Sequence, residues 1–320
     1  MVIKTAIIGL GIMGRRMLEH MRIHEGYAPN FLWDPDPAAC QLALEQAPDA
    51  TVMESAEAVI AASDLIYLAC PPIPRKAFAL TAAASGKAIF LEKPLGVDVK
   101  ESADLVEQLV KARVPVAVNY TQAAGVALTG ISKAVRSGDM GDILGVDIVV
   151  TYAAWPRQWQ KSADWLRFRA EGGMTREVIS HFLFFSERIL GPLELIWSCS
   201  SYPDDATLCE THMLARLENA DGRPVTVMAS VGGAQPDRQE LTIKGSKFSR
   251  RVSDFFRDSA SIGGEFEPVG KDPDDPRRVG LKAQLDDLLL CLNGHSHRLA
   301  TLEEALRVQK LVEEMLIVKV

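Results

Sequence analysis

The first 120 residues alternate short hydrophobic runs, rich in Ile, Leu and Val, with longer Ala/Leu/Glu stretches of helical period. This alternation predicts βαβ units and a parallel sheet, because strands buried on both faces are continuously apolar and connecting helices are amphipathic. We expect strands at residues 4–8, 30–33, 65–70, 88–91 and 116–118. We expect helices at residues 14–24, 38–46, 75–85 and 100–112. A weak strand at 51–52 and a short helix at 56–61 complete this region.

The pattern changes after residue 120. A helix at 126–137 ends at Gly138, and longer segments with alternating apolar and polar positions follow, which predict an antiparallel sheet. These strands are expected at residues 143–153, 193–200, 209–217, 225–231 and 240–244. Further helices are expected at 175–190, 281–292 and 301–317, and the Gly-, Pro- and Asp-rich stretch 260–278 is expected to be a surface loop.

The length of 320 residues and this change of pattern predict two domains. We place a doubly wound α/β domain at residues 1–120 and a second α/β domain, with a mainly antiparallel sheet, at residues 121–320. In an alternative arrangement the C-terminal helix packs back on the first domain.

Charge and composition narrow the classes of partner. The formal net charge of −7 argues against nucleic acid or an anionic membrane as main partner, since both favour a basic face. The five scattered cysteines have no disulfide or zinc-ligand spacing and are expected to be buried free thiols. No metal site and no membrane span are predicted. We therefore expect a cytoplasmic protein that binds a small molecule.

A glycine-rich loop follows the first predicted strand. Gly9, Gly11 and Gly14 have the GxGxxG spacing, which is weak evidence alone but stronger between a strand and a helix. Gly9 allows the tight turn, Gly11 lets the backbone approach a pyrophosphate, and Gly14 lets helix and strand pack closely. The helix N-terminus then offers N–H groups and a positive dipole end to the phosphates. The loop predicts a dinucleotide-binding Rossmann domain.

Asp34 ends the second predicted strand, twenty residues after Gly14. A carboxylate at this position accepts hydrogen bonds from the adenosine ribose and repels a 2′-phosphate, which favours NAD over NADP. Arg15 and Arg16 keep NADP as the alternative, since an arginine can bind a 2′-phosphate. A second interpretation is that residues 34–37 form only a solvated turn.

Several motifs in order along nearly the whole chain resemble the Gfo/Idh/MocA family of oxidoreductases. They are the glycine loop, Cys70-Pro71-Pro72, Gly86-Lys87, Glu92-Lys93-Pro94-Leu95, residues 137–143, and Gly172-Gly173 followed by Glu177 and His181. The resemblance implies a second domain with a large open sheet that often serves for oligomer contact, here in a homodimer or homotetramer. It also implies hydride transfer between NAD(P) and a secondary alcohol or ketone of a sugar, sugar acid or cyclitol.

The resemblance implies catalytic roles for Lys93, His181 and Glu177. A lysine at the carboxyl end of a parallel strand can stabilise an alkoxide, and an imidazole can exchange a proton at neutral pH. Glu177 and His181 share a helix face at i, i+4 spacing. The opposing interpretations are a surface lysine paired with Glu92 and a surface Glu/His pair. The residues expected to bind the cofactor are Gly9, Gly11, Ile12, Met13, Gly14, Asp34, Cys70, Pro71, Pro72, Glu92, Lys93 and Asn119.

The substrate region departs from the family pattern. Glu177 stands where aspartate is usual and Glu171 where a third glycine is usual, while Arg176 lies beside them. Because arginine binds carboxylates and phosphates bidentately, Arg176 suggests an acidic or otherwise polar-rich substrate; the alternative is an ion pair with Glu171 or Glu177.

A tryptophan-rich segment precedes these positions. Trp165 and its neighbours would either roof a polyol or pack between subunits. The expected substrate-binding residues are Lys93, Arg176, Glu177, His181 and Trp165.

Two other functions remain open, a non-catalytic NAD(P)-binding sugar-sensing regulator and an NAD-dependent glycosidase.

Overall fold

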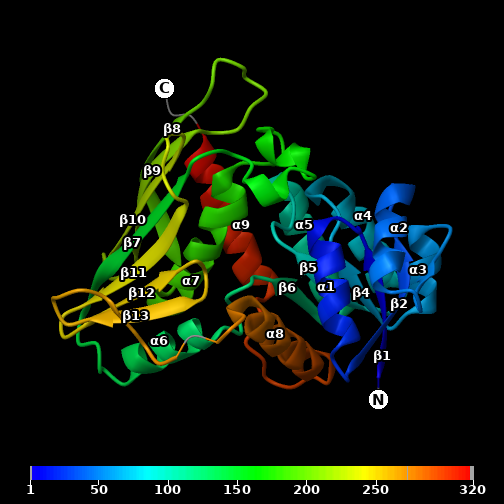
Figure 1. The fold of residues 1–320 in the computed structure, drawn as a ribbon. Helices are drawn as coiled ribbons and strands as arrows, with labels where there is room; N and C mark the ends of the chain where they lie inside the picture. Colours follow the sequence, from blue (N-terminus) through cyan, green and yellow to red (C-terminus); the bar gives the residue numbers. More distant parts are fainter. Residues whose placement is uncertain (1, 272, 318–320) are drawn as a thin grey trace. The chain divides into compact units, whose positions relative to one another are not determined.

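A computed structural model describes residues 2–271 and 273–317. These residues form two compact units. The first unit contains residues up to Tyr120 together with Leu281–Leu306, and the second contains Thr121–Gly280 and the chain from Arg307 onward. Figure 1 gives the element labels used below. The grouping of residues 281–306 with the first unit differs from the expected assignment of residues 121–320 to one domain.

The first unit has a six-stranded parallel sheet in the order β3-β2-β1-β4-β5-β6. This order is that of a doubly wound dinucleotide-binding sheet, as expected. The central strands β4 and β5 are buried at every position, which explains their unbroken apolar sequences. The strands are β1 (Ile3–Ile8), β2 (Tyr27–Trp33), β3 (Thr51–Val52), β4 (Leu65–Leu68), β5 (Ala88–Glu92) and β6 (Val116–Asn119).

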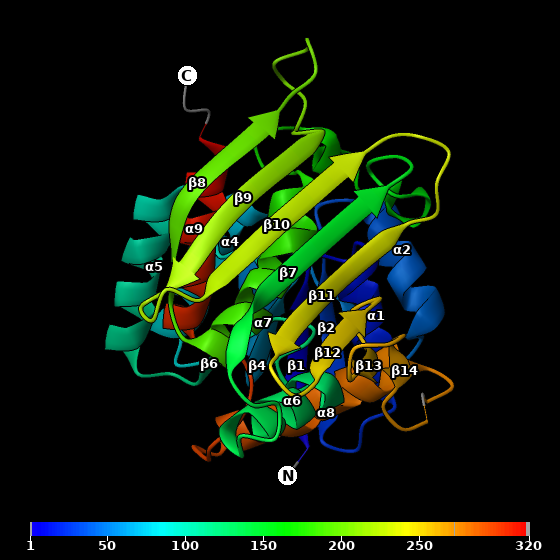
Figure 2. The same ribbon diagram turned by 90° about the vertical axis from the view of Figure 1, so that its left-hand side faces the viewer.

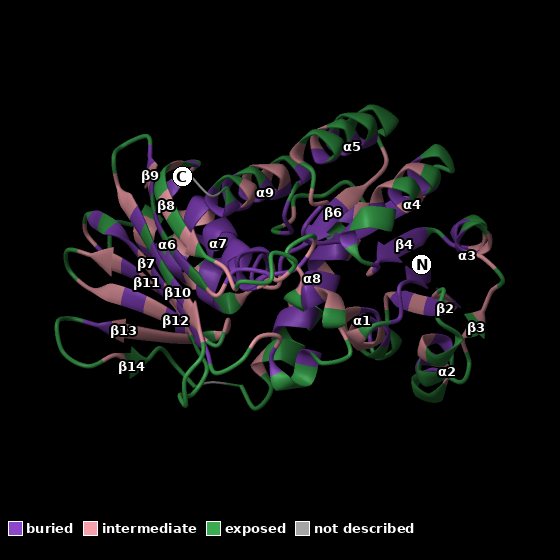
Figure 3. Ribbon diagram, turned by 90° about the horizontal axis from the view of Figure 1, so that it is seen from above, coloured by how far each residue is buried: buried purple, intermediate pink, exposed green. Residues whose placement is uncertain are grey.

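Helices cover both faces of this sheet, with α1, α2 and α8 on one side and α4 and α5 on the other (Figure 3). Several helices begin at a residue whose side chain accepts backbone N–H bonds; Asp98, for example, caps α5 through Lys100 N at 2.8 Å. The helices connecting these strands are α1 (Ile12–Arg22), α2 (Pro37–Gln46), α3 (Ala56–Ala62), α4 (Pro72–Ala84) and α5 (Val99–Ala112).

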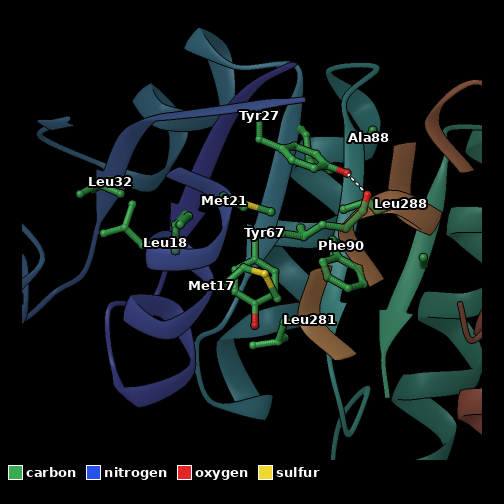
Figure 4. Packing of buried hydrophobic residues seen from close by; sticks show 14 of the residues in the cluster. Met17, Leu18, Met21, Tyr27, Leu32, Tyr67, Ala88, Phe90, Leu281 and Leu288 are labelled. Atoms are coloured by element: carbon green, nitrogen blue, oxygen red, sulfur yellow. Dashed lines mark hydrogen bonds between the residues drawn. The ribbon is translucent and has the colours of Figure 1, made fainter. Parts of the chain in front are cut away.

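The core of the first unit explains why a late helix belongs to it. Helix α8 (Pro276–Leu292) contributes Leu281, Leu285 and Leu288 to the cluster that contains Met17 and Phe90 (Figure 4). The hydroxyl of Tyr27 also donates to the carbonyl of Leu285 at 2.6 Å. Burial of these leucines holds residues 281–306 to a sheet formed more than 160 positions earlier.

The second unit has an eight-stranded sheet in the order β14-β13-β12-β11-β7-β10-β9-β8, seen face-on in Figure 2. All pairs are antiparallel except β7 with β10, which confirms a large, mainly antiparallel sheet. The strands are β7 (Ile143–Tyr152), β8 (Leu193–Ser201), β9 (His212–Asn219), β10 (Pro224–Val231), β11 (Arg238–Gly245), β12 (Ser249–Ser253), β13 (Arg257–Ser261) and β14 (Glu267–Pro268).

Three of these strands were not expected. β12 and β13 are short and rich in serine and charged residues, and β14 has only two residues, so their sequences lack an apolar alternation. They extend the sheet from β11 through backbone pairing instead. The expectation that residues 260–278 form only a loop is therefore wrong at β14 and at the start of α8.

The helix expected at residues 175–190 consists of two parts. A π-helical turn, η3 (Thr175–Ile179), leads into α7 (Ser180–Leu190). Helix α7 is buried over most of its circumference, as its colour in Figure 3 shows, so the opposing interpretation of a surface Glu/His pair is wrong at His181. The other elements of this region are α6 (Val126–Arg136), the 3-10 turns η1 (Gln158–Gln160) and η2 (Asp164–Arg167), and α9 (Leu302–Leu316).

Two composition-based expectations can be compared with the structure. In the described part of the chain no helix combines the length and the apolar character needed to cross a membrane. All five cysteines are free, and four are buried, but Cys199 on β8 is exposed. The expectation that every cysteine is buried is therefore wrong at Cys199, because the Cys199 side chain lies on the exposed face of β8.

Candidate active site

The glycine loop joins β1 to α1 in the first unit and requires glycine at two positions. Gly9 has a φ of +94°, and a Cβ there would lie 2.5 Å from the backbone nitrogen of Cys70. A Cβ on Gly14 would lie 1.8 Å from the carbonyl oxygen of Gly9. A Cβ on Gly11, in contrast, would meet no atom within 4 Å. Gly11 is thus not needed for packing and leaves the surface of the loop open.

Asp34 follows β2 and lies against this loop. Its Oδ2 accepts a hydrogen bond from the backbone N–H of Leu10 at 2.6 Å, and its Oδ1 accepts from Asp36 N at 2.9 Å. Each carboxylate oxygen can accept a second hydrogen bond, so the side chain keeps acceptor capacity for a ribose. The structure therefore brings Asp34 together with the glycine loop and with the Cys70 turn.

The turn after β5 holds Lys93, which is buried with 8% of its surface exposed. The opposing expectation of a surface lysine is therefore wrong. Arg75 on α4 braces this turn: its Nη1 donates to the carbonyls of Glu92, at 2.7 Å, and Pro94. Its Nη2 donates to the carbonyl of Cys70, which ties the lysine turn to the turn beside the glycine loop.

Glu92 is buried inside the same turn. Its Oε1 accepts from the Tyr67 hydroxyl and from Asn119 Nδ2, the latter at 2.7 Å. Burial raises the pKa of the Glu92 carboxyl above its ordinary value, although the two donors and the charges of Lys93 and Arg75 oppose the shift. Glu92 thus supports the turn from within, rather than pairing with Lys93 at the surface.

The burial of Glu92 predicts how the stability of the protein depends on pH. Because the pKa of Glu92 is raised in the folded state, its contribution to stability is complete below the unfolded-state pKa of about 4.3 and is lost as pH rises through the folded pKa. Glu92→Gln keeps an acceptor for Tyr67 and Asn119 but cannot ionise. We expect the free energy of unfolding of Glu92→Gln, relative to wild type, to increase between pH 4 and pH 8.

Urea denaturation at several pH values measures this difference. Glu45→Gln on α2 is the control, because Glu45 is exposed. A pH-independent difference between Glu92→Gln and wild type would contradict a buried, ionising Glu92. Glu210, whose buried carboxyl also has a raised pKa, remains in both proteins and cancels in the comparison.

In the second unit, the Gly172-Gly173 pair permits a close approach to η3. A Cβ on Gly172 would lie 2.2 Å from the carbonyl oxygen of Leu166, and one on Gly173, with φ +106°, would lie 2.4 Å from Oε2 of Glu210. The other carboxylate oxygen of Glu210 accepts from Thr175 N at 2.7 Å. A buried carboxylate therefore caps the turn that carries Glu177. π-Helical turns recur at functional sites.

Glu177 extends from η3 toward the segment after β7. Gln160 Nε2 donates to Glu177 Oε1 at 3.5 Å, and Gln160 Oε1 accepts from Arg157 Nε at 2.8 Å. Glu177 is half-buried and Gln160 is buried. The Glu177 carboxylate is thereby held by a buried amide and is not an ordinary surface charge.

His181 lies in the first turn of α7 and is buried, with 6% of its surface exposed. The edge of its ring packs on Phe255, whose centroid is 5.4 Å away and which also stacks on Phe182. Phe255 has a φ of +67°, an unusual conformation for a bulky residue, and Gln122 Nε2 donates to its carbonyl at 3.1 Å. The turn between β12 and β13 thus fixes the orientation of the imidazole.

Arg176 and Trp165 differ from the other predicted substrate residues. Arg176 is buried, and its Nε and Nη2 each donate to Glu313 at 2.7 Å, while Nη1 donates to the carbonyls of Arg169 and Gly172. Its ion-pair partner is neither Glu171 nor Glu177. Every nitrogen of this guanidinium is engaged internally, so Arg176 gives no support to an acidic substrate. Trp165 is half-buried in η2.

The Rossmann geometry of the first unit agrees with the family that its sequence matches. Residues 3–120 match the Gfo/Idh/MocA family, described as an oxidoreductase family with an NAD-binding Rossmann fold. The expected resemblance is confirmed, and the first unit is an NAD-binding Rossmann domain.

Two curated proteins resemble this chain over about half of its length. An uncharacterized oxidoreductase of Streptococcus pneumoniae is 23% identical over 174 residues, which cover 54% of this chain and 46% of that protein. An inositol 2-dehydrogenase of Pseudarthrobacter chlorophenolicus is 28% identical over 147 residues, covering 44% and 43%. The chain thus spans less than half the length of the curated relatives that it matches.

Solved structures resemble nearly the whole fold. An oxidoreductase from Agrobacterium radiobacter in complex with NAD+, L-tartaric acid and magnesium superposes with a TM-score of 0.85 at 16% identity. The superposition covers 98% of this chain and 95% of that one. This likeness shows the fold of the second unit but not its substrate.

The residues of the Rossmann domain fit an NAD cofactor. Gly11 leaves open space at the N-terminus of α1, and no side chain caps that helix end. Ile12 and Met13 are its first residues, so their N–H groups point out of the helix toward an incoming phosphate. Asn119 adds a buried Oδ1 that accepts no hydrogen bond from the described residues. Cys70, Pro71 and Pro72 form the turn against Gly9.

Four supporting residues were missed from the sequence: Arg75, Gln160, Glu210 and Phe255. Only Arg75 carries a local signal, since a basic side chain in the first turn of a helix opposes the helix dipole and suggests another role. The others are recognisable only through partners that are distant in sequence.

Proposed function

We propose that this Gfo/Idh/MocA protein is an NAD-dependent dehydrogenase acting on a secondary alcohol of a sugar, sugar acid or cyclitol. The observation that carries the proposal is Lys93, a buried lysine at the carboxyl end of β5 in an NAD-binding domain. Ligands of open α/β sheets bind at this edge. The inositol 2-dehydrogenase relative supports an alcohol substrate.

The proposed cofactor contacts are the glycine loop, the N-terminus of α1, Asp34, the Cys70 turn and Asn119. Asp34 favours NAD over NADP, because its carboxylate at the loop would repel a 2′-phosphate. Arg15 donates to the carbonyl of Leu10 at 2.6 Å, so this arginine is already engaged within the loop. NAD supplies the hydride acceptor when bound.

The proposed catalytic residues are Lys93, His181 and Glu177. We assign to His181 the role of accepting the proton of the substrate hydroxyl during oxidation, and to the Lys93 ammonium the role of stabilising negative charge that develops on the substrate. Glu177 binds a substrate hydroxyl. Gln160 holds the Glu177 carboxylate, and Phe255 orients the His181 ring. Both groups are therefore offered to the substrate in fixed conformations.

A screen of NAD and NADP reduction tests this proposal. Sugars, aldonates, uronates and inositols are supplied to the purified protein, and the absorbance of reduced nicotinamide is followed. Formation of NADH with at least one polyol is expected, at a higher kcat/KM with NAD than with NADP. A regulator would give no turnover, and a glycosidase would cleave its substrate without net NADH.

We also propose that the open face of the second sheet forms a subunit contact. Leu214 on β9 and Met228 on β10 are directly paired and exposed, and Trp197 on β8 is exposed beside them. Figure 2 shows this sheet with α7 and α9 behind it. Light scattering of the purified protein tests the proposal, with a homodimer or homotetramer expected and a monomer at micromolar concentration contradicting it.

A further inference from the structure

Arg157 is a buried arginine without a carboxylate partner. Only 8% of its surface is exposed, and it belongs to no ion pair among the residues that the structure describes. Its Nε donates to Gln160 Oε1 at 2.8 Å, and its Nη1 lies 3.4 Å from Gln239 Oε1 and 3.5 Å from the Tyr152 hydroxyl. These acceptors are neutral, so no charge within hydrogen-bond distance balances the guanidinium.

Three aromatic rings surround this guanidinium. Its central carbon lies 4.7 Å from the ring centroid of Trp159, 5.1 Å from that of Tyr152 and 5.7 Å from that of Trp155. Cation–π contacts partly stabilise a buried cation, but by only about 0.5–2 kcal/mol each. A buried charge normally needs a counter-ion as well. The three rings therefore hold the Arg157 guanidinium in place, but they do not neutralise its charge.

A second arginine strengthens the positive field. The pKa of Arg277, in the first turn of α8, is lowered by burial and next by the charge of Arg157. An anion bound near Arg157 would reduce this repulsion between the two guanidinium groups. Three carboxylates act on the neighbouring Tyr152, and each has another partner: Asp237 accepts from Ala153 N, Glu177 accepts from Gln160, and Asp254 pairs with Arg257.

We propose that Arg157 binds an anionic group of the substrate, a carboxylate or a phosphate carried by the polyol. Gln160 links this site to Glu177, since the same amide accepts from Arg157 and donates to the Glu177 carboxylate. A polyol whose acid group meets Arg157 therefore presents a hydroxyl to Glu177 within the same unit. This inference rests on the proposed dehydrogenase function and narrows its substrate class.

Arg157, and not Arg176, therefore supports the hypothesis of an acidic substrate. Arg176 is neutralised by Glu313, whereas Arg157 faces only amide, hydroxyl and aromatic partners. The solved relative that holds L-tartaric acid shows that an acid with hydroxyl groups is bound by a protein of this fold. It supports the proposal without placing that acid in this chain.

Binding is measured first, because it does not depend on turnover. Aldonates, sugar phosphates and the matching neutral alditols are titrated against the NAD-loaded protein while tryptophan fluorescence is recorded, since Trp155 and Trp159 contact Arg157. We expect an acid to bind at least tenfold more tightly than its alditol. Arg157→Gln should remove most of that preference, and Arg157→Lys should retain only part of it, because lysine lacks the bidentate fork.

Arg277→Gln and Arg167→Gln complete the experiment. Arg277 as a whole is exposed, although its guanidinium is partly desolvated, so its substitution tests the positive field without disturbing the aromatic cluster and should weaken acid binding severalfold. Arg167 is an exposed arginine of the same segment, paired with Asp164, and its substitution should leave acid binding unchanged. If Arg157→Gln fails to fold, as judged by circular dichroism, the more conservative Arg157→Lys decides the question.

The outcomes separate this inference from the dehydrogenase proposal. Loss of acid preference in the Arg157 and Arg277 variants supports the anion site, even if the wild-type protein reduces no NAD with any polyol. In that case only the proposed dehydrogenase function fails. Equal binding of acids and alditols by wild type, no acid binding at all, or an acid preference that both arginine variants retain would overturn the anion site. Whether aldonates or sugar phosphates bind more tightly identifies the anion.

Discussion

Replacing Lys93 by methionine is expected to lower kcat for NAD-dependent polyol oxidation roughly 100- to 10,000-fold, the range of an acid–base or alkoxide-stabilising group. The buried side chain lies in a turn whose carbonyls are held by Arg75, so methionine occupies similar space while the ammonium is lost. His181→Asn is expected to cause a loss of the same order. NAD affinity should change far less than kcat in either variant, although Lys93 is also expected to contact the cofactor, because the glycine loop, the N-terminus of α1 and Asp34 are expected to hold most of the NAD molecule.

Steady-state kinetics and calorimetric titration with NAD measure these two quantities. Lys100→Met provides a matched control, since Lys100 is an exposed lysine at the start of α5. The double variant should lose little more activity than the worse single variant if the two residues act as one unit. Wild-type turnover in the double variant would end the assignment of both residues.

The second large effect concerns the glycine loop. Gly14→Ala is expected to destabilise the Rossmann domain by about 2–3 kcal/mol, because the new Cβ would lie 1.8 Å from the carbonyl oxygen of Gly9 and backbone must move. Gly11→Ala should change the free energy of unfolding by less than about 1 kcal/mol, since nothing lies within 4 Å of its Cβ position. Yet it should weaken NAD binding roughly tenfold or more by obstructing the pyrophosphate.

Denaturant unfolding and NAD titration of the two variants separate packing from ligand approach. Gly86→Ala, at a glycine of positive φ outside the loop, shows the cost of backbone strain alone. Strong destabilisation by Gly11→Ala would contradict the open space at that position. Unchanged NAD affinity in Gly11→Ala would place the pyrophosphate elsewhere.

Much of the first unit could be predicted because its signals are local. β4 and β5 are continuous apolar runs, and α5 combines an Asp98 cap with a helical period. The short strands β12 and β13 could not be predicted in the same way. Their residues are polar and their pairing depends on β11, so tertiary context outweighs local pattern.

The candidate site shows the same division. The glycine loop and Asp34 follow from spacing, whereas the ion pair between Arg176 and Glu313 could not be predicted, because the two residues are 137 positions apart. Nothing local distinguishes Arg157 from the other arginines of its segment. Its significance depends on burial among Tyr152, Trp155 and Trp159 and on neutral acceptors, which only a folded structure reveals.

The central claim is hydride transfer from a substrate carbon to NAD, and one isotope experiment tests it most directly. The polyol that reduces NAD fastest is supplied with deuterium at the carbon that is oxidised, and the nicotinamide product is examined by mass spectrometry. We predict one deuterium in each reduced cofactor molecule, accumulating with turnover in wild type and lost with Lys93→Met. Reduced cofactor without deuterium, or no net reduction with any polyol, would contradict the account.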